Sequence, residues 1–301
     1  MNAAMQVTEI DLETRETRPR IPAPGKCIYC YEVYPDNELT EEHVIPYALA
    51  ANAMILEKSC CKTCQREITK YEQAVLKHQL GVFRAQTDAP TRNKKDRPKE
   101  VDIHFVEVDE NMEVTGDLGT RAIPIMAAPT MINLWQSPPP AILQETFSRP
   151  SEPWAWSDKA AVDALCKKVA EETGAKHGIA MSIGKVNRQH YLRSLAKMAH
   201  AYAAAEVGVD AFTPFLCDII LNKADDLETY VGDMPGIGPF VFDPDHTLQI
   251  SLGEADGGDA GSYLVVRIQL YPSLRSPEHV VVVGRPTRNL DPNAQSAEQG
   301  A

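Results

Sequence analysis

The fold of the first part of this chain is decided by residues 27–65, CIYCYEVYPDNELTEEHVIPYALAANAMILEKSCCKTCQ. It contains two Cys-x-x-Cys pairs: Cys27 and Cys30, and Cys61 and Cys64. Zinc prefers four thiolates in a tetrahedron, and a two-residue spacer lets both cysteines of a pair reach one ion. The two pairs therefore predict a structural zinc site. Cys60 leaves an alternative open, because it can replace Cys61, although its spacer to Cys64 is less suitable.

The use of cysteine also indicates the compartment. The chain has seven cysteines, and an odd number without a secretion signal argues against a disulfide framework. The first residues mix acids and arginines and lack the apolar core of a signal peptide. No uninterrupted apolar run reaches the roughly 20 residues of a membrane helix. We therefore expect a cytoplasmic protein that does not enter a membrane.

The charge of the chain is unevenly distributed. Its net charge of −12 is unusual for a protein that binds nucleic acid, which normally presents a basic surface. Between Arg84 and Lys99, however, six basic residues outnumber two acidic ones. Because distant charges are screened at physiological salt, such a strip can follow a phosphate backbone on an acidic protein. The alternative is a solvated linker. The predicted nucleic-acid contacts are Arg84, Arg92, Lys94, Lys95 and Arg97.

Changes in composition predict five segments. Polar stretches without periodicity stand at both ends, and proline-rich stretches interrupt the middle of the chain. We predict a disordered arm (1–25), the cysteine-rich module (26–90), a basic linker with a β-hairpin (91–145), an α+β domain of unknown role (146–286) and a disordered tail (287–301).

Apolar periodicity predicts the elements. Helical spacing from Ile68 to Phe83 indicates a helix that ends between residues 81 and 89. Alternation at 101–105, with a partner at 111–114, indicates the hairpin. In the second domain, helical patterns that stop at glycines precede a glycine-rich turn and alternating or apolar strands: 248–252, 266–270 and 280–283. The predicted fold class is α+β, with a small zinc module before a domain of helices and an antiparallel meander.

Between the cysteine pairs lies Glu41-Glu42-His43-Val44-Ile45-Pro46. In a strand, Glu42 and His43 point to opposite faces unless a bulge or bend intervenes. The order Cys-x2-Cys, acid-His-aliphatic-x-Pro, and Cys-x2-Cys opening a helix resembles the zinc-stapled branch of the HNH endonucleases, which have a ββα-metal fold. The resemblance continues through the helix and the basic tract, to about residue 99.

This resemblance implies roles for single residues. His43 matches the general base that activates water, a task that suits a neutral imidazole. Glu42 matches a ligand of a catalytic Mg²⁺ or Mn²⁺, which stabilises the phosphate and the leaving oxygen. Asn52 falls near the asparagine that braces the histidine loop. Gln65 stands where a second metal ligand, usually asparagine or histidine, is expected. Glu72, two helical turns further on nearly the same face, is the alternative ligand.

We therefore expect a metal-dependent HNH endonuclease that hydrolyses phosphodiester bonds, with DNA as the expected substrate. Two alternatives stay open. The first is a catalytically silent zinc module that binds nucleic acid or protein, which the net acidity and Gln65 favour. The second is a nuclease effector whose C-terminal domain responds to a protein or small-ligand partner, because a long folded segment follows the module.

Overall fold

The computed structural model describes residues 20–49, 54–91, 95, 97–143, 150–182, 186–234 and 247–287. It is a mixed α+β structure, which confirms the predicted fold class. The described chain forms two compact units, which combine segments that the sequence prediction treated separately. Unit 1 comprises Met1–Glu72, Trp135–Glu152 and Arg188–Ala301, and unit 2 comprises Gln73–Leu134 and Pro153–Asn187. Within the described ranges, no helix has the length and apolar composition needed to cross a membrane.

The first part of unit 1 has the ββα order that the HNH resemblance implies. After a short turn of 3₁₀-helix (η1, Asp36–Glu38), β2 (Leu39–His43) and β3 (Ile55–Cys61) pair antiparallel, and α1 (Lys62–Gln73) follows β3 directly. The short β1 (Arg20–Ile21), which lies within the predicted arm, pairs parallel with β3. Most of the arm and all of the predicted tail except Thr287 lie outside the described residues.

The helix predicted from the spacing of apolar residues continues past α1. It passes into a π-helical segment (η2, Ala74–Gln79) and, after Leu80, into α2 (Gly81–Gln86). The Leu80 N–H donates to the Val75 carbonyl at 2.9 Å, which closes the wider π turn. The predicted end between residues 81 and 89 is therefore confirmed, and Ile68 and Tyr71 are buried as the spacing indicates.

The C-terminal part of unit 1 is an antiparallel sheet in the order β10-β13-β12-β11, with β9 on the edge of β13. The predicted meander is confirmed: β11 and β12 pair from Leu248↔Leu270 to Asp256↔Ser262, and a turn with η6 (Gly258–Ala260) joins them. The segment η7 (Pro272–Leu274) leads into β13. The strands are β9 (Phe212–Pro214), β10 (Val231–Asp233), β11 (Leu248–Asp256), β12 (Ser262–Leu270) and β13 (Glu278–Pro286).

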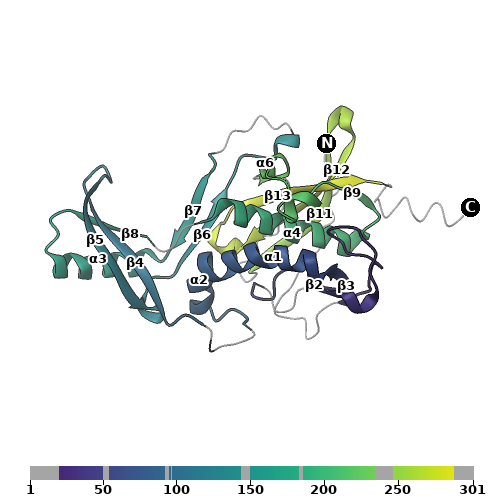
Figure 1. The fold of residues 1–301 in the computed structure, drawn as a ribbon. Helices are drawn as coiled ribbons and strands as arrows, with labels where there is room; N and C mark the ends of the chain where they lie inside the picture. Colours follow the sequence, from purple (N-terminus) through teal and green to yellow (C-terminus); the bar gives the residue numbers. More distant parts are fainter. Residues whose placement is uncertain are drawn as a thin grey trace, which may run out of the picture. The chain divides into compact units, whose positions relative to one another are not determined.

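A long helix, α4 (Arg188–Val207), lies between this sheet and α1 (Figure 1). Every residue from Tyr191 to Ala204 is buried, because α4 packs on the sheet with one side and on the cysteine-rich segment 27–72 with the other. The helix ends at Gly208, whose φ of +90° suits glycine. Two single-turn helices follow, α5 (Cys217–Ile220) and α6 (Leu227–Tyr230).

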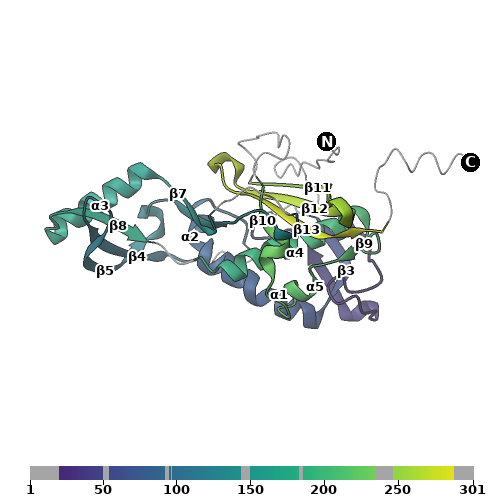
Figure 2. The ribbon, with the colours of Figure 1, turned by 90° about the horizontal axis from the view of Figure 1, so that it is seen from above.

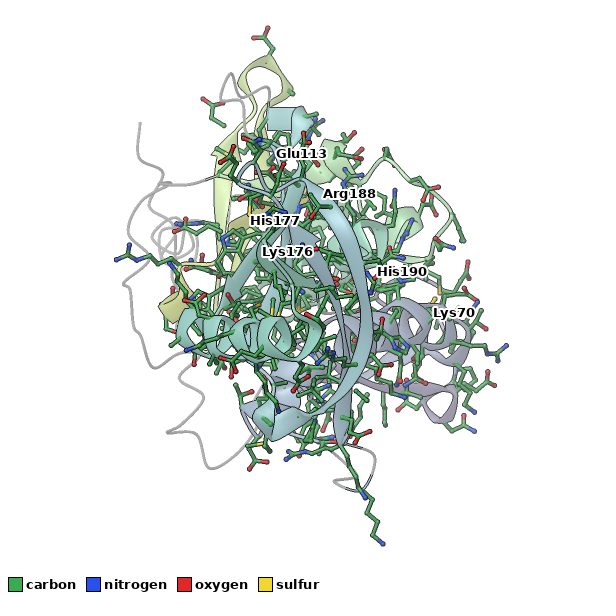
Figure 3. All side chains as sticks on the ribbon, turned by 90° about the vertical axis from the view of Figure 1, so that its left-hand side faces the viewer. Lys70, Glu113, Lys176, His177, Arg188 and His190 are labelled. Carbon is green, nitrogen blue, oxygen red and sulfur yellow. The ribbon has the colours of Figure 1, made fainter. Side chains whose placement is uncertain are left out.

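Unit 2 is a three-stranded sheet in the order β5-β4-β8, with α3 (Lys159–Thr173) packed on one face (Figure 2). Its strands are β4 (Glu100–Val108), β5 (Val114–Pro124) and β8 (Gly178–Ser182). Ile103 and Phe105 form its core with Val169 of α3. Lys176 and His177, labelled in Figure 3, each donate a backbone N–H to the Glu107 carboxylate, at 2.8 and 3.0 Å, and so place β8 beside β4.

The hairpin of unit 2 differs slightly from the prediction. Its second strand begins at Val114, at the end of the predicted partner 111–114. The reason is the Asp109 carboxylate, which accepts the N–H groups of Asn111 and Glu113 at 2.9 Å each and holds these residues in a turn. The remaining elements are η4 (Ile125–Ala127), β6 (Met131–Gln136), η5 (Ala141–Leu143) and β7 (Glu152–Ser157); β6 and β7 pair.

The proline run at 138–140 lies directly on β10 in unit 1. The Ser137 N–H donates to Asp233 Oδ2 at 2.7 Å, and Asp233 Oδ1 in turn lies 2.6 Å from His279 Nδ1. The His279 ring reaches the Tyr191 hydroxyl of α4 at 2.8 Å. All four residues are buried, so this network joins the proline run, the sheet and α4.

Gly232→Ala should therefore destabilise unit 1. An alanine Cβ at this position would lie 2.6 Å from Pro140 N and 2.7 Å from Pro139 C, both backbone atoms that cannot easily move. We expect a loss of roughly 1–3 kcal/mol in the free energy of unfolding, measured by urea titration. Gly81→Ala is the control, because its Cβ meets nothing closer than 3.7 Å. An equal effect of both substitutions would contradict the close approach at Gly232.

Candidate zinc and nuclease site

The four predicted zinc ligands come together. Cys27 and Cys30 precede β2, Cys61 ends β3 and Cys64 lies in the first turn of α1. Their sulfur atoms all lie within 4.8 Å of one another, and Cys30 Sγ is 4.0 Å from Cys61 Sγ. Four thiolates at about 2.3 Å from one zinc ion lie about 3.8 Å apart, so the cluster fits a single tetrahedral ion. It is the only group of three or more potential metal ligands within the described ranges.

The backbone prepares this cluster for a metal. The Cys61 N–H donates to Cys27 Sγ at 3.4 Å, and the Cys64 N–H donates to Cys61 Sγ at 3.5 Å. Hydrogen bonds from the thiols of Cys60 and Cys64, and then from backbone N–H groups, lower the pKa of Cys27. A thiolate is the form that binds zinc. Cys60 is buried beside the cluster, but its sulfur is not one of the four that lie within 4.8 Å of one another.

Cys61→Ser should abolish zinc binding, whereas Cys60→Ser should keep one zinc ion per chain. The reason is that only Cys61 belongs to the four-thiolate cluster. A structural zinc contributes about 10–16 kcal/mol in small modules, so loss of zinc should also remove the circular dichroism of α1. Zinc content by elemental analysis and far-ultraviolet spectra measure both effects. Loss of zinc from Cys60→Ser with retention in Cys61→Ser would reverse the assignment.

Glu42 and His43, the last two residues of β2, have different surroundings. A bulge between Thr40 and Glu42 interrupts the pairing with β3. The Glu42 side chain is buried, whereas His43 stays partly exposed and has the Tyr47 ring beside it at 6.4 Å between centroids. The imidazole is therefore accessible, while the neighbouring carboxylate is enclosed.

The partner of the enclosed carboxylate is Lys197 of α4. Its ammonium forms an ion pair with Glu42 Oε1, lies 3.1 Å from Glu72 Oε1 and donates to the backbone carbonyl of His43 at 2.6 Å. Lys197 is almost fully buried, with 2% of its side chain exposed. Two of the predicted metal ligands and the predicted general base thus meet at one lysine.

The charges in this group support one another. Burial opposes the charge on Lys197, but Glu42 and Glu72 outweigh it and raise the pKa of the ammonium above its usual value. Burial, and then the negative charge of Glu42, raise the pKa of Glu72, while Lys197 counteracts this rise. Lys197 is therefore a stable cation held between two carboxyl groups.

The contacts of Lys197 bear on the predicted site for a catalytic divalent ion, because they involve two of its three predicted ligands. Gln65 is exposed on α1, whereas the side chains of Glu42 and Glu72 are largely enclosed. Glu42 and Glu72 approach each other, but the charge between them already belongs to Lys197. A divalent ion there would face a fixed like charge in a buried setting, so the pair does not fit Mg²⁺ or Mn²⁺ as arranged. The use of Glu42, Gln65 and Glu72 as ligands stays a prediction.

His200, one turn beyond Lys197, holds the first cysteine pair. Its Nε2 donates to the Ile28 carbonyl at 2.7 Å, and its ring packs among Tyr29, Tyr31 and Phe212. Complete burial lowers the pKa of His200 to about 4, so the imidazole is neutral at pH 7. Lys197 and His200 together bind α4 to both ends of the loop between the first cysteine pair and His43.

Acid should weaken the fold through His200. Its pKa is lower in the folded than in the unfolded chain, so the unfolded state takes up the additional proton as the pH falls from 6.5 toward 4. We expect a loss of about 3 kcal/mol in the free energy of unfolding over this range from this group. His200→Gln keeps an N–H donor and cannot be protonated, so its stability should fall less steeply. Urea titrations of both proteins with excess zinc measure the difference, and parallel pH profiles would contradict it.

The predicted nucleic-acid strip is only partly described. The Arg84 guanidinium donates to the carbonyls of Leu76 and Pro90 at 2.8 and 3.0 Å. Arg97 forms an ion pair with Asp88 and donates to the Ala89 carbonyl. Both side chains therefore have partners within residues 76–90 of the chain. Lys95 is exposed. Arg92 and Lys94, and also Asn52, lie outside the described residues.

Lys197 is a functional residue that the motifs of the sequence do not mark, although the pattern of α4 contains a signal for it. Arg193, Lys197 and His200 recur at spacings of four and three residues, on one face of an otherwise apolar helix. Arg193 likewise donates to the Ile219 carbonyl at 2.7 Å and pairs with Asp225. A polar stripe on a buried helix predicts backbone or carboxylate partners, because buried charges require them.

The comparisons with known proteins agree with this geometry. Residues 27–80 match the family described as HNH endonuclease, which confirms the resemblance drawn from the two cysteine pairs and the Glu-His pair. The match covers the cysteine cluster, His43 and all of α1. This part of the chain is therefore similar to HNH endonucleases and is referred to below as the HNH module. No curated protein and no solved structure matches the chain.

Proposed function

We propose that this protein is an endonuclease that hydrolyses phosphodiester bonds in DNA, with His43 as the general base. The observation that carries the proposal is the position of His43. His43 is partly exposed at the end of β2, its backbone carbonyl accepts a hydrogen bond from the buried Lys197, and the cysteine cluster lies in the same HNH module. An accessible side chain on a fixed backbone is what a general base requires.

In the proposed reaction, an imidazole nitrogen of His43 takes a proton from water. The water oxygen attacks the phosphorus atom, the bond between phosphorus and the 3′-oxygen breaks, and the leaving oxygen takes a proton from the solvent. The cysteine cluster, when it holds zinc, keeps β3 and α1 in register with the loop before β2. Any Mg²⁺ or Mn²⁺ that supplies positive charge at the phosphate would have to be held by groups other than Glu42 and Glu72, because these are paired with Lys197.

Cleavage of supercoiled plasmid tests the proposal. With zinc-loaded protein and added Mg²⁺ or Mn²⁺, His43→Ala should lower the rate by about 10²–10⁴-fold, because a general base contributes that much. His104→Ala is the matched control, since His104 lies in β4 of unit 2 and contacts Thr120. Circular dichroism and zinc content show that both variants are folded. A wild type that is inert with several divalent ions, or an active His43→Ala, would disprove the proposal.

A catalytically silent zinc module that binds nucleic acid or protein is the second candidate. The ion pairs of Lys197 with Glu42 and Glu72 favour it, because they occupy the carboxylates expected to bind metal. In that case, the protein would retain plasmid in a gel-shift assay without cutting it. The reducing cytoplasm is the proposed compartment for either function, since free thiolates are needed for zinc.

Control of the nuclease by the C-terminal part, through a protein or small-ligand partner, is a further possibility for the same chain. An experiment that tests this control has to keep α4 in place, because α4 contacts the HNH module. Lys197 and His200 donate to carbonyls of the HNH module, so residues 26–90 expressed alone would lose both partners. The full chain is therefore the proper material for activity measurements.

A further inference from the structure

The ammonium of Lys197 lies among the groups that the HNH resemblance assigns to a catalytic metal ion. We propose that Lys197 is the resident cation of the Glu42–Glu72 pair: it takes the place of a divalent ion and positions His43. The role for His43 rests on the proposed nuclease function, whereas the occupation of the carboxylates by Lys197 does not.

The geometry supports this inference first. The Lys197 Nζ lies at an ion-pair distance from Glu42 Oε1, at 3.1 Å from Glu72 Oε1 and at 2.6 Å from the His43 carbonyl oxygen. Mg²⁺ requires near-octahedral oxygen ligands at about 2.0–2.1 Å and usually keeps several waters. The space between these oxygens therefore cannot contain both the ammonium and a hydrated divalent ion.

The burial of Lys197, Glu42 and Glu72 is the second observation that supports the proposal. The exposed fractions of the side chains are 2% for Lys197, 8% for Glu42 and 18% for Glu72. Glu72 Oε1 is buried without a hydrogen-bond partner among the described residues, so the charge of Lys197 is what compensates it. The residues of α4 on both sides of Lys197, from Tyr191 to Ala204, are buried as well.

The same contacts make Lys197 a positioning residue for the proposed general base. The hydrogen bond to the His43 carbonyl joins residues 154 positions apart and fixes the backbone at the end of β2. The ammonium does not touch the imidazole through this bond, so it acts on His43 through the main chain. Removal of the ammonium should free the two carboxylates, which then attract a cation from solution.

Binding of Mn²⁺ to the zinc-loaded full chain, without nucleic acid, tests the proposal. Electron paramagnetic resonance of free Mn²⁺ gives the affinity for the wild type, Glu72→Gln, Lys197→Met and the double variant. We expect Glu72→Gln to leave the affinity of the wild type unchanged. Lys197→Met should bind Mn²⁺ at least tenfold more tightly, and the double variant should lose this gain. Lys223→Met is the matched control, because Lys223 is exposed near Asp218 and should change nothing.

Two results would overturn the inference. One is a wild type whose Mn²⁺ affinity falls tenfold or more in Glu72→Gln, because the pair would then bind the metal with Lys197 present. The other is a folded Lys197→Met without any gain. Should Lys197→Met lose its zinc and its fold, the comparison of wild type with Glu72→Gln decides alone. A lack of plasmid cleavage would contradict the nuclease proposal and leave these binding results unchanged.

Discussion

A buried ammonium group holds the central part of this protein together. Lys197 of α4 contacts Glu42, Glu72 and the His43 carbonyl, and the removal of one partner from such a buried pair typically costs about 3–5 kcal/mol. Any arrangement that separates α4 from the HNH module leaves charges unpaired in an apolar setting. This constraint explains why segments that are far apart in the chain form a single compact unit.

The same constraint shapes the candidate active site. The Lys197 ammonium and the His200 imidazole act on carbonyl oxygens, so they hold the main chain of the HNH module and leave its functional side chain untouched. The cysteine cluster holds the other end of the loop before β2 and the start of α1. His43 is thus partly exposed, while buried contacts hold the backbone on both sides of it. Its neighbour Glu42 is buried and takes part in these contacts.

Much of this could be predicted from local patterns. The two Cys-x-x-Cys pairs, the helix from Ile68 and the alternating strands after residue 247 each depend on contacts between near neighbours, and these appear as predicted. The basic strip shows where such reasoning ends. Arg84 and Arg97 look available in the sequence, yet they donate to the carbonyls of Pro90 and Ala89, which follow α2.

The sequence by itself determined the four-cysteine cluster and the ββα order, because short spacing restricts which side chains can meet. Only the tertiary structure decided where Glu42 points and which cation it meets. A bulge turns this carboxylate inward, and its partner comes from a helix more than 150 residues further along the chain. No local pattern specifies such a contact, since it arises from the packing of α4 against the module.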